Sequence, residues 1–113
     1  MDIRMQEYPF EFDGKSFVLR CNMNVLAELQ ESNGGTIPNI FDEKNTLNNF
    51  LAYLSAMMND FAEEQGWPER YTPKQLGRKI ALADGVLISE VLNLVIRANY
   101  VESDSDTEQD SKN

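Results

Sequence analysis

The sequence contains no histidine, the residue that proteins use most often as a general base and as a metal ligand. Without histidine, neither a Ser/His/Asp nor a Cys/His catalytic relay can form. The single cysteine, Cys21, allows no internal disulfide and no ordinary zinc site. We therefore expect no enzyme, no cofactor and no metal site, in a protein that works in a reducing compartment. Cys21 itself is expected to be a small buried hydrophobe.

Glycine pairs and long apolar runs are also scarce. Gly34-Gly35 is the one adjacent pair, and it lacks the longer Gly-rich pattern ending in Gly-Lys-Ser/Thr that cradles phosphate. No apolar run approaches the ~18 residues that a membrane span requires, and the first residues are not followed by the apolar stretch of a signal peptide. The sequence therefore predicts no phosphate loop, no membrane segment and no leader.

Basic residues are outnumbered, because the formal net charge is −9. Nucleic-acid binding draws mainly on Lys and Arg that neutralise phosphates, so this balance argues against a nucleic-acid partner. Much of the excess lies in residues 101–113, VESDSDTEQDSKN, which hold five acids, one base and one apolar residue. Such a segment buries too little apolar surface to offset the entropy of ordering. We expect a single domain over residues 1–100 and a disordered acidic tail over 101–113.

Residues 8–20 predict a β-hairpin. Phe10 and Phe12 alternate with Glu11, and Phe17 and Leu19 alternate with Val18. Alternation of this kind places one set of side chains on a buried face. Asp13-Gly14 supplies the positive φ angles of a tight turn. A hairpin alone is marginal in water, so it must pack on the helices.

Helical periodicity and capping residues predict the rest of the fold, an α+β arrangement in which the hairpin packs on about four helices. Asn22, Thr46, Thr72 and Asp84 are the expected N-caps, and glycines end the first two helices. The second helix has the clearest stripe, from Leu47 through Phe50 and Leu54 to Phe61. In the loop before it, Ile37, Ile40 and Phe41 are expected to anchor the chain to the core. The predicted helices span residues 23–32, 47–65, 73–82 and 85–99.

The last helix is apolar on more than one face, which is typical of a central core helix or of one shared with a partner. The candidate partner or oligomer interface on it comprises Leu87, Val91, Leu92, Val95 and Ile96. The sequence leaves open whether these residues serve the core, a self-interface or a partner.

A local basic cluster is the second candidate surface, and it comprises Arg70, Lys74, Arg78 and Lys79. It is either a docking patch for an acidic partner or the solvated side of a short helix, and the second reading is favoured because isolated surface charges contribute little. Asp60, Glu63 and Glu64 on the second helix lack the glycine-punctuated loop of a calcium site, so we interpret them as a solvated face.

The chain resembles the tail assembly chaperones of siphophage-type bacteriophages and related prophages. The resemblance covers most of residues 8–99. It lies in residues 10–15 (FEFDGK), 22–31 (NMNVLAELQE), 34–35 (GG), 57–60 (MMND), 65–67 (QGW), 71–73 (YTP) and 76–77 (LG).

This resemblance implies a small α+β protein-binding protein that acts in the host bacterial cytoplasm. Members of the family keep the long phage tape-measure protein soluble, are displaced by the tail-tube protein, and are absent from the mature virion. The resemblance also implies a homo-oligomer, and many such genes express a longer, frameshifted product. Two alternatives remain: a small structural virion protein of the tail or head-completion type, and a non-phage regulatory or antitoxin-like binding module.

Overall fold

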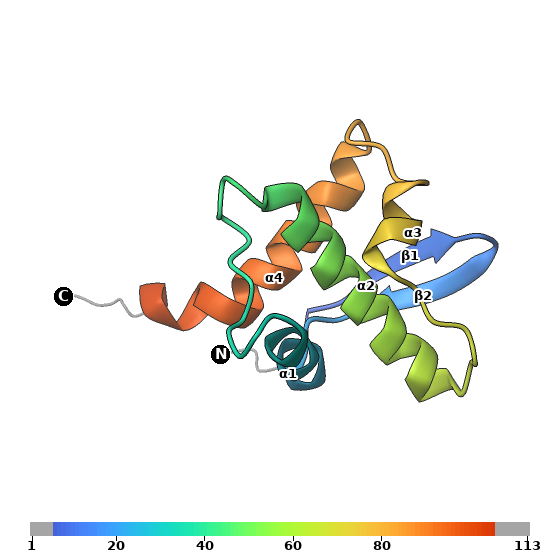
Figure 1. Cartoon of the computed structure of the whole chain (residues 1–113), viewed down its shortest axis with the longest axis horizontal. Helices are drawn as coiled ribbons and strands as arrows, with labels where there is room; N and C mark the ends of the chain where they lie inside the picture. The colour runs from blue at the N-terminus through green and yellow to red at the C-terminus, as the bar shows by residue number, and fades with distance from the viewer. Residues whose placement is uncertain (1–5, 106–113) are drawn as a thin grey trace.

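The computed structural model describes residues 6–105 of the chain, and it has the predicted α+β fold. An antiparallel hairpin is followed by helices on which it packs (Figure 1). The elements are β1 (Tyr8–Phe12), β2 (Lys15–Leu19), α1 (Met23–Ser32), α2 (Thr46–Gln65), α3 (Pro73–Gly77) and α4 (Gly85–Ser105).

The hairpin turns through the predicted Asp-Gly pair. Asp13 has φ 50° and Gly14 has φ 77°, the positive values of the type I′ turn that matches strand twist. The register pairs Phe12 with Lys15 and Phe10 with Phe17. Phe17 and Leu19 are fully buried, whereas Phe10 and Phe12 are half-buried against the same core. The alternating pattern therefore predicted the correct inner face.

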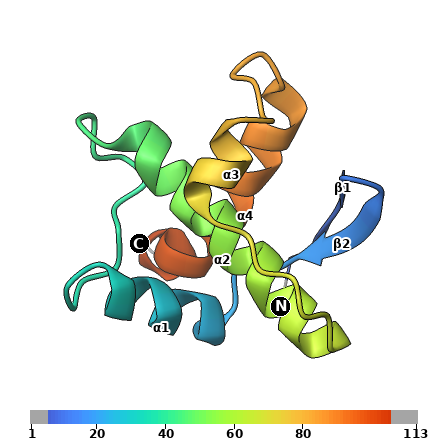
Figure 2. The same ribbon diagram turned by 45° about the vertical axis from the view of Figure 1, so that its right-hand side comes forward.

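Helix α2 is the centre of the fold, because it contacts α1, α3, α4 and β2. In Figure 2 it runs between α1 on one side and α3 on the other. Its inner side is fully buried at Tyr53, Leu54 and Met58. Rings from α2 and the α2–α3 connector meet the hairpin, with Phe61 and Trp67 both packing on Phe17. The hairpin is thus held on the helices by apolar contact, as its marginal intrinsic stability requires.

Side chains cap three of the helices as predicted. Asn22 Oδ1 accepts a hydrogen bond from Val25 N at 3.0 Å, and Asp84 Oδ1 accepts one from Leu87 N at 3.3 Å. Thr72 forms a reciprocal capping box with Gln75. The prediction of Thr46 as a cap is wrong: Asn45 occupies the cap position without a side-chain bond, and the Thr46 hydroxyl donates to Asp42 O instead.

Two helix ends differ from their predictions. Helix α3 stops at Gly77 rather than at residue 82, because glycine is a weak helix former. Helix α4 is described as far as Ser105, whereas the sequence predicted its end at residue 99. An established helix adds one hydrogen bond for each residue that it fixes, which lets it extend into a polar segment. Residues 106–113 of the predicted tail lie outside the described part of the chain.

The loop between α1 and α2 is held differently from the prediction. Ile40 is buried, but Ile37 is 40% exposed and Phe41 is 58% exposed. The loop is instead tied down by the Tyr53 hydroxyl, which donates to Pro38 O at 2.9 Å inside the core. Leu47 was also expected in the core stripe of α2 and is 61% exposed, because the core does not reach the first turn of that helix.

Candidate functional site

The inner side of α4 belongs to the core of the molecule. Leu87, Val91 and Val95 are each at most 2% exposed and pack within the main apolar cluster. In the folded monomer these three side chains cannot reach a partner, so the prediction that places them in a partner interface needs correction. These side chains recur every four residues along one side of α4, and they belong to the same buried cluster as the apolar side chains of α2.

A second row of apolar side chains lies beside the buried one on α4. Ile88, Leu92 and Ile96 recur every four residues and are each half-buried; we call them the α4 ridge. Ile88 and Leu92 pack against the core, whereas Ile96 is not among the residues that do. Of the predicted interface, Leu92 and Ile96 are therefore the members that retain accessible apolar surface in the monomer.

Exposed apolar side chains also occur at the ends of the helices. Leu82 and Val86, at the entrance to α4, are 73% and 67% exposed, and Met23 at the start of α1 is 78% exposed. The sequence did not distinguish these residues from core positions, since periodicity shows which side chains share a face but not how far the core extends along it. Phe41 and Leu47 are exposed as well, so apolar side chains are accessible at several separate places on the surface.

Two members of the predicted basic cluster are engaged within the chain. The Arg70 guanidinium donates to Trp67 O at 2.8 Å and to Glu69 O at 2.7 Å, so it braces the α2–α3 connector. Lys79 Nζ contacts both carboxylate oxygens of Asp13, at 2.9 and 3.0 Å, and thereby ties the end of α3 to the hairpin turn.

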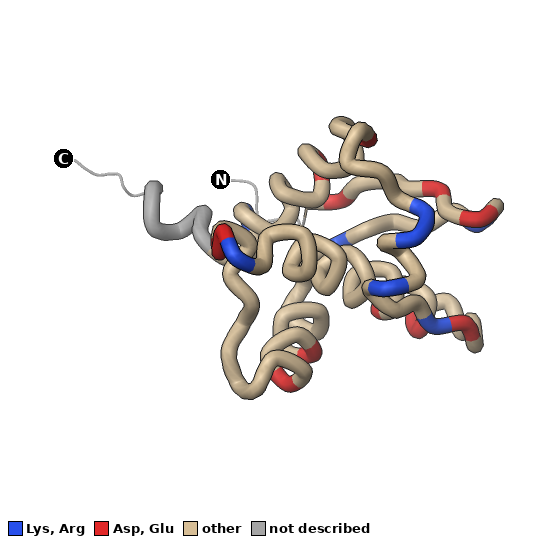
Figure 3. The backbone as a smooth tube through the Cα atoms, turned by 45° about the horizontal axis from the view of Figure 1, so that its top comes forward, with Lys and Arg blue, Asp and Glu red and all other residues tan. Residues whose placement is uncertain are grey.

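The other two members, Lys74 and Arg78, are exposed and make no ion pair with any residue in the described part of the chain. Figure 3 shows acidic positions interleaved with the basic ones on this side of the molecule rather than a uniform basic surface. The available basic patch is therefore reduced to Lys74 and Arg78, and docking of an acidic partner there stays a prediction.

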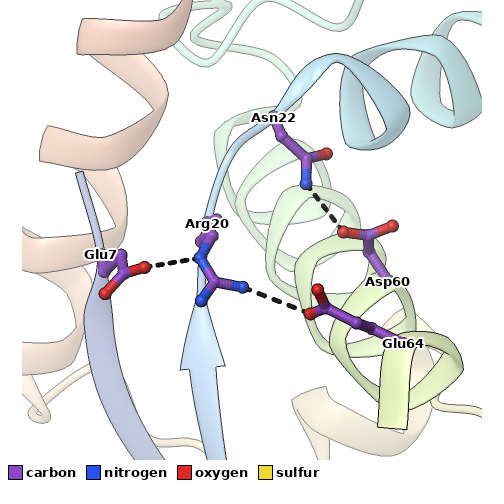
Figure 4. A network of polar contacts seen from close by, with 5 residues as sticks. All are labelled: Glu7, Arg20, Asn22, Asp60 and Glu64. Carbon is purple, nitrogen blue, oxygen red and sulfur yellow. Dashed lines mark hydrogen bonds and ion pairs between the residues drawn. The ribbon is translucent and has the colours of Figure 1, made fainter. Parts of the chain in front are cut away.

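Acidic side chains of α2 serve to join the hairpin to the helices (Figure 4). Arg20 lies between Glu7, whose carboxylate is 2.7 Å from its Nε, and Glu64, whose carboxylate is 3.4 Å from its Nη1. These contacts, above all the hydrogen bond to Glu7, raise the pKa of Arg20. Beside them, Asn22 Nδ2 donates to Asp60 at 2.8 Å.

The carboxylates of α1 and α2 are close enough to influence one another. Partial burial raises the pKa of Glu28, and the negative charges of Asp60 and Glu63 raise it further. Within residues 6–105, no three acidic or cysteine side chains are arranged to hold a metal ion. Asp60 and Glu64 accept hydrogen bonds from Asn22 and Arg20, which follow the hairpin in the chain.

Cys21 is buried at the end of the hairpin, with 4% of its surface exposed. Burial raises the pKa of its thiol to about 12, far above the range in which a thiolate forms near neutral pH. This placement agrees with the predicted role of a small buried hydrophobe and does not favour a nucleophile.

Every helix in residues 6–105 is too short or too polar to cross a lipid bilayer. Comparison of the chain with protein-family models, with curated proteins and with solved structures found no match.

Proposed function

We propose that this protein is a tail assembly chaperone that binds the tape-measure protein of a long-tailed phage and keeps it soluble during tail morphogenesis. The proposal places its action in the host bacterial cytoplasm, as a homo-oligomer that is displaced by the tail-tube protein and is absent from the mature virion. The motifs that resemble this family, from the FEFDGK hairpin to the YTP helix start, supply the identity of the partner.

The α4 ridge is the observation that carries the binding half of this proposal. Leu92 and Ile96 lie one turn apart on one side of a long helix and keep part of their apolar surface accessible. A tape-measure protein is a long helical chain, and an amphipathic helix is recognised by apolar surface spaced at i, i+4.

The decisive experiment is co-expression of the tape-measure protein with and without this chain, followed by measurement of the soluble fraction. We expect the wild-type chain to raise that fraction and an Ile96→Asp variant to lose the effect. An Asn93→Asp variant is the matched control, because it adds the same charge at an exposed polar position of α4. Unchanged solubility with the wild-type chain would reject the proposal.

Mass spectrometry of purified virions separates the chaperone from a structural component. A chaperone that is displaced during assembly should be missing from the particles. Stoichiometric amounts of this chain in virions would favour the structural alternative instead.

A further inference from the structure

The chain leaves α1 through Asn33-Gly34-Gly35, and the backbone there is exposed and incompletely hydrogen-bonded. Residues 30–37 are all exposed, and Figure 2 shows this end of α1 at the periphery of the molecule. Gly34 has φ 72°, and the Gly35 N–H donates to Gln30 O at 2.9 Å, as in the Schellman end of a helix. No group in the described part of the chain accepts a hydrogen bond from the Gly34 N–H. The backbone nitrogen that follows the Asn33 side chain is therefore unpaired.

The Asn33 side chain lies over the following turn rather than in the core. Its Nδ2 donates to Thr36 O at 2.9 Å and to Thr36 Oγ1 at 3.2 Å. Both bonds are local and exposed, so each contributes little and opens readily. The space around Gly34 and Gly35 is also open, since a Cβ built at either position meets no atom within 4 Å. The turn can therefore rearrange without disturbing the core.

Asn33 is the one asparagine of the sequence that precedes a glycine. A Cβ on the following residue shields its backbone nitrogen from the asparagine side chain, and glycine has no Cβ. Attack by that nitrogen on the side-chain carbonyl requires the ψ of Asn33 to rotate away from its value of 30°. A glycine after the rotating bond presents the smallest steric barrier to this motion. The chemistry and the freedom of the backbone thus coincide at Asn33.

We propose that Asn33 is a site of spontaneous deamidation, at which the chain modifies itself. The Gly34 nitrogen gives its proton to solvent and attacks Asn33 Cγ. A bond forms between that nitrogen and Cγ, the Cγ–Nδ2 bond breaks, and Nδ2 takes up a proton and leaves as ammonia. Water then opens the cyclic imide. Opening at Cγ gives aspartate, and opening at the main-chain carbonyl carbon gives isoaspartate, in which the main chain runs through the former side chain. Water is the co-reactant.

The product alters the end of α1. A carboxylate replaces the Nδ2 donor, so the bonds to Thr36 are lost and a negative charge faces the Thr36 carbonyl oxygen. Negative charge is also unfavourable at the C-terminal end of a helix, where the last carbonyls carry partial negative charge. We expect the Gly35 amide, which bonds to Gln30 O, to exchange with solvent about fivefold faster in Asn33→Asp than in the wild type.

The modification involves only the chain itself and does not depend on the proposed chaperone activity. Incubation of the native full chain at mildly alkaline pH, followed by peptide mapping in a mass spectrometer, tests it. The peptide with Asn33 should gain the mass that separates aspartate from asparagine, and fragmentation should identify both aspartate and isoaspartate. The gain should be faster at higher pH, because the attacking nitrogen must lose its proton.

Two other asparagines are internal controls in the same digest. Asn24 and Asn45 are exposed but precede Val25 and Thr46, so their peptides should keep their mass. No gain at Asn33, or equal gain at all three positions, would overturn the proposal. A gain at Asn33 in the denatured chain but not in the native chain would show that the fold blocks the reaction, and would likewise overturn it.

Asn33→Gln is the matched variant, because it keeps the charge and the amide but lengthens the side chain, so that attack by the Gly34 nitrogen would have to close a larger ring. We expect its peptide to keep its mass over the time in which the wild type reacts. A gain at the wild-type rate would show that the reaction does not proceed through that attack, and would overturn the proposal. Circular dichroism shows whether the variant is folded. If it is not, the native wild-type map and its two internal controls still decide the question.

Discussion

Asn59 is the residue through which α2 holds the connector to α3. Its side chain accepts a hydrogen bond from Tyr71 N at 2.7 Å and donates one to Tyr71 O at 2.8 Å, in the manner of a paired strand. The same carbonyl accepts a bond from the Ser55 hydroxyl at 2.9 Å. This clamp positions the Tyr71 ring against Phe12 and Phe17 of the hairpin.

We expect Asn59→Ala to lower the free energy of unfolding by about 1–3 kcal/mol, because it leaves the partly buried backbone of Tyr71 without its partners. Chemical denaturation measures the change. Asn49→Ala is the matched control, since it removes a single exposed bond to Asn39 O and should cost less. A larger loss for Asn49→Ala would contradict the role assigned to the clamp.

The Cys21 thiol should be almost inert in the folded protein. With a pKa of about 12, roughly one thiol in ten thousand is ionised at pH 8, and the side chain is also buried. A thiol reagent should therefore react slowly with the native chain and rapidly in denaturant. Equal rates in the two conditions would show that the thiol is accessible.

The same shift predicts how stability depends on pH. The thiol pKa rises on folding from 9.0 to about 12, so the unfolded chain loses this proton first. Its contribution to stability is full below pH 9 and is lost as pH rises toward 12. The difference in unfolding free energy between wild type and Cys21→Ala should shrink over that interval, and a constant difference would contradict the assignment.

At the scale of elements, Gly66 ends α2 in the left-handed conformation, with φ 79°. We expect Gly66→Ala to destabilise the fold by about 1 kcal/mol, because a Cβ is strained at this φ even though the surrounding space is open. Gly85→Ala is the control: its site at the start of α4 is also open and has no positive φ, so alanine should be neutral or stabilising there. Thermal unfolding of both variants tests the contrast.

Helix α4 combines a core side with an accessible ridge. Val95→Asp places a charge at a fully buried position and should unfold the chain. Ile96→Asp changes the neighbouring residue, which is half-buried and outside the main cluster, and should leave the circular dichroism spectrum native. If both variants unfold, Ile96 belongs to the core and the ridge cannot be the partner surface.

For the whole molecule, Asn99 ties the later part of α4 to the core, because its side chain donates to the Tyr53 hydroxyl at 3.2 Å. In Figure 1 the end of α4 beyond this region projects away from the other elements. We therefore expect deletion of residues 102–113 to leave the melting temperature nearly unchanged. Deletion from residue 95 onward, which removes Val95 and Asn99, should abolish cooperative unfolding. A large loss of melting temperature in the shorter deletion would reject this expectation.

Local sequence signals determined most of the fold of this protein. Asp13-Gly14 specified the hairpin turn, Asn22, Thr72 and Asp84 specified three helix starts, and Gly66 specified the end of α2. These signals act through the backbone within a few residues, so they can be recognised without knowing what packs nearby. The absence of histidine likewise restricts the chemistry available to the chain, whatever its fold.

Tertiary structure decided which apolar residues are buried. Leu47 and Phe41 have the same apolar chemistry as Phe50 and Ile40, yet the first pair is exposed and the second pair is buried. Burial depends on which elements from distant parts of the chain meet, and the pattern within one helix does not contain that information. For the same reason the sequence grouped Val91 with Leu92, whereas the packing of α4 on the core buries Val91 and leaves Leu92 half-buried.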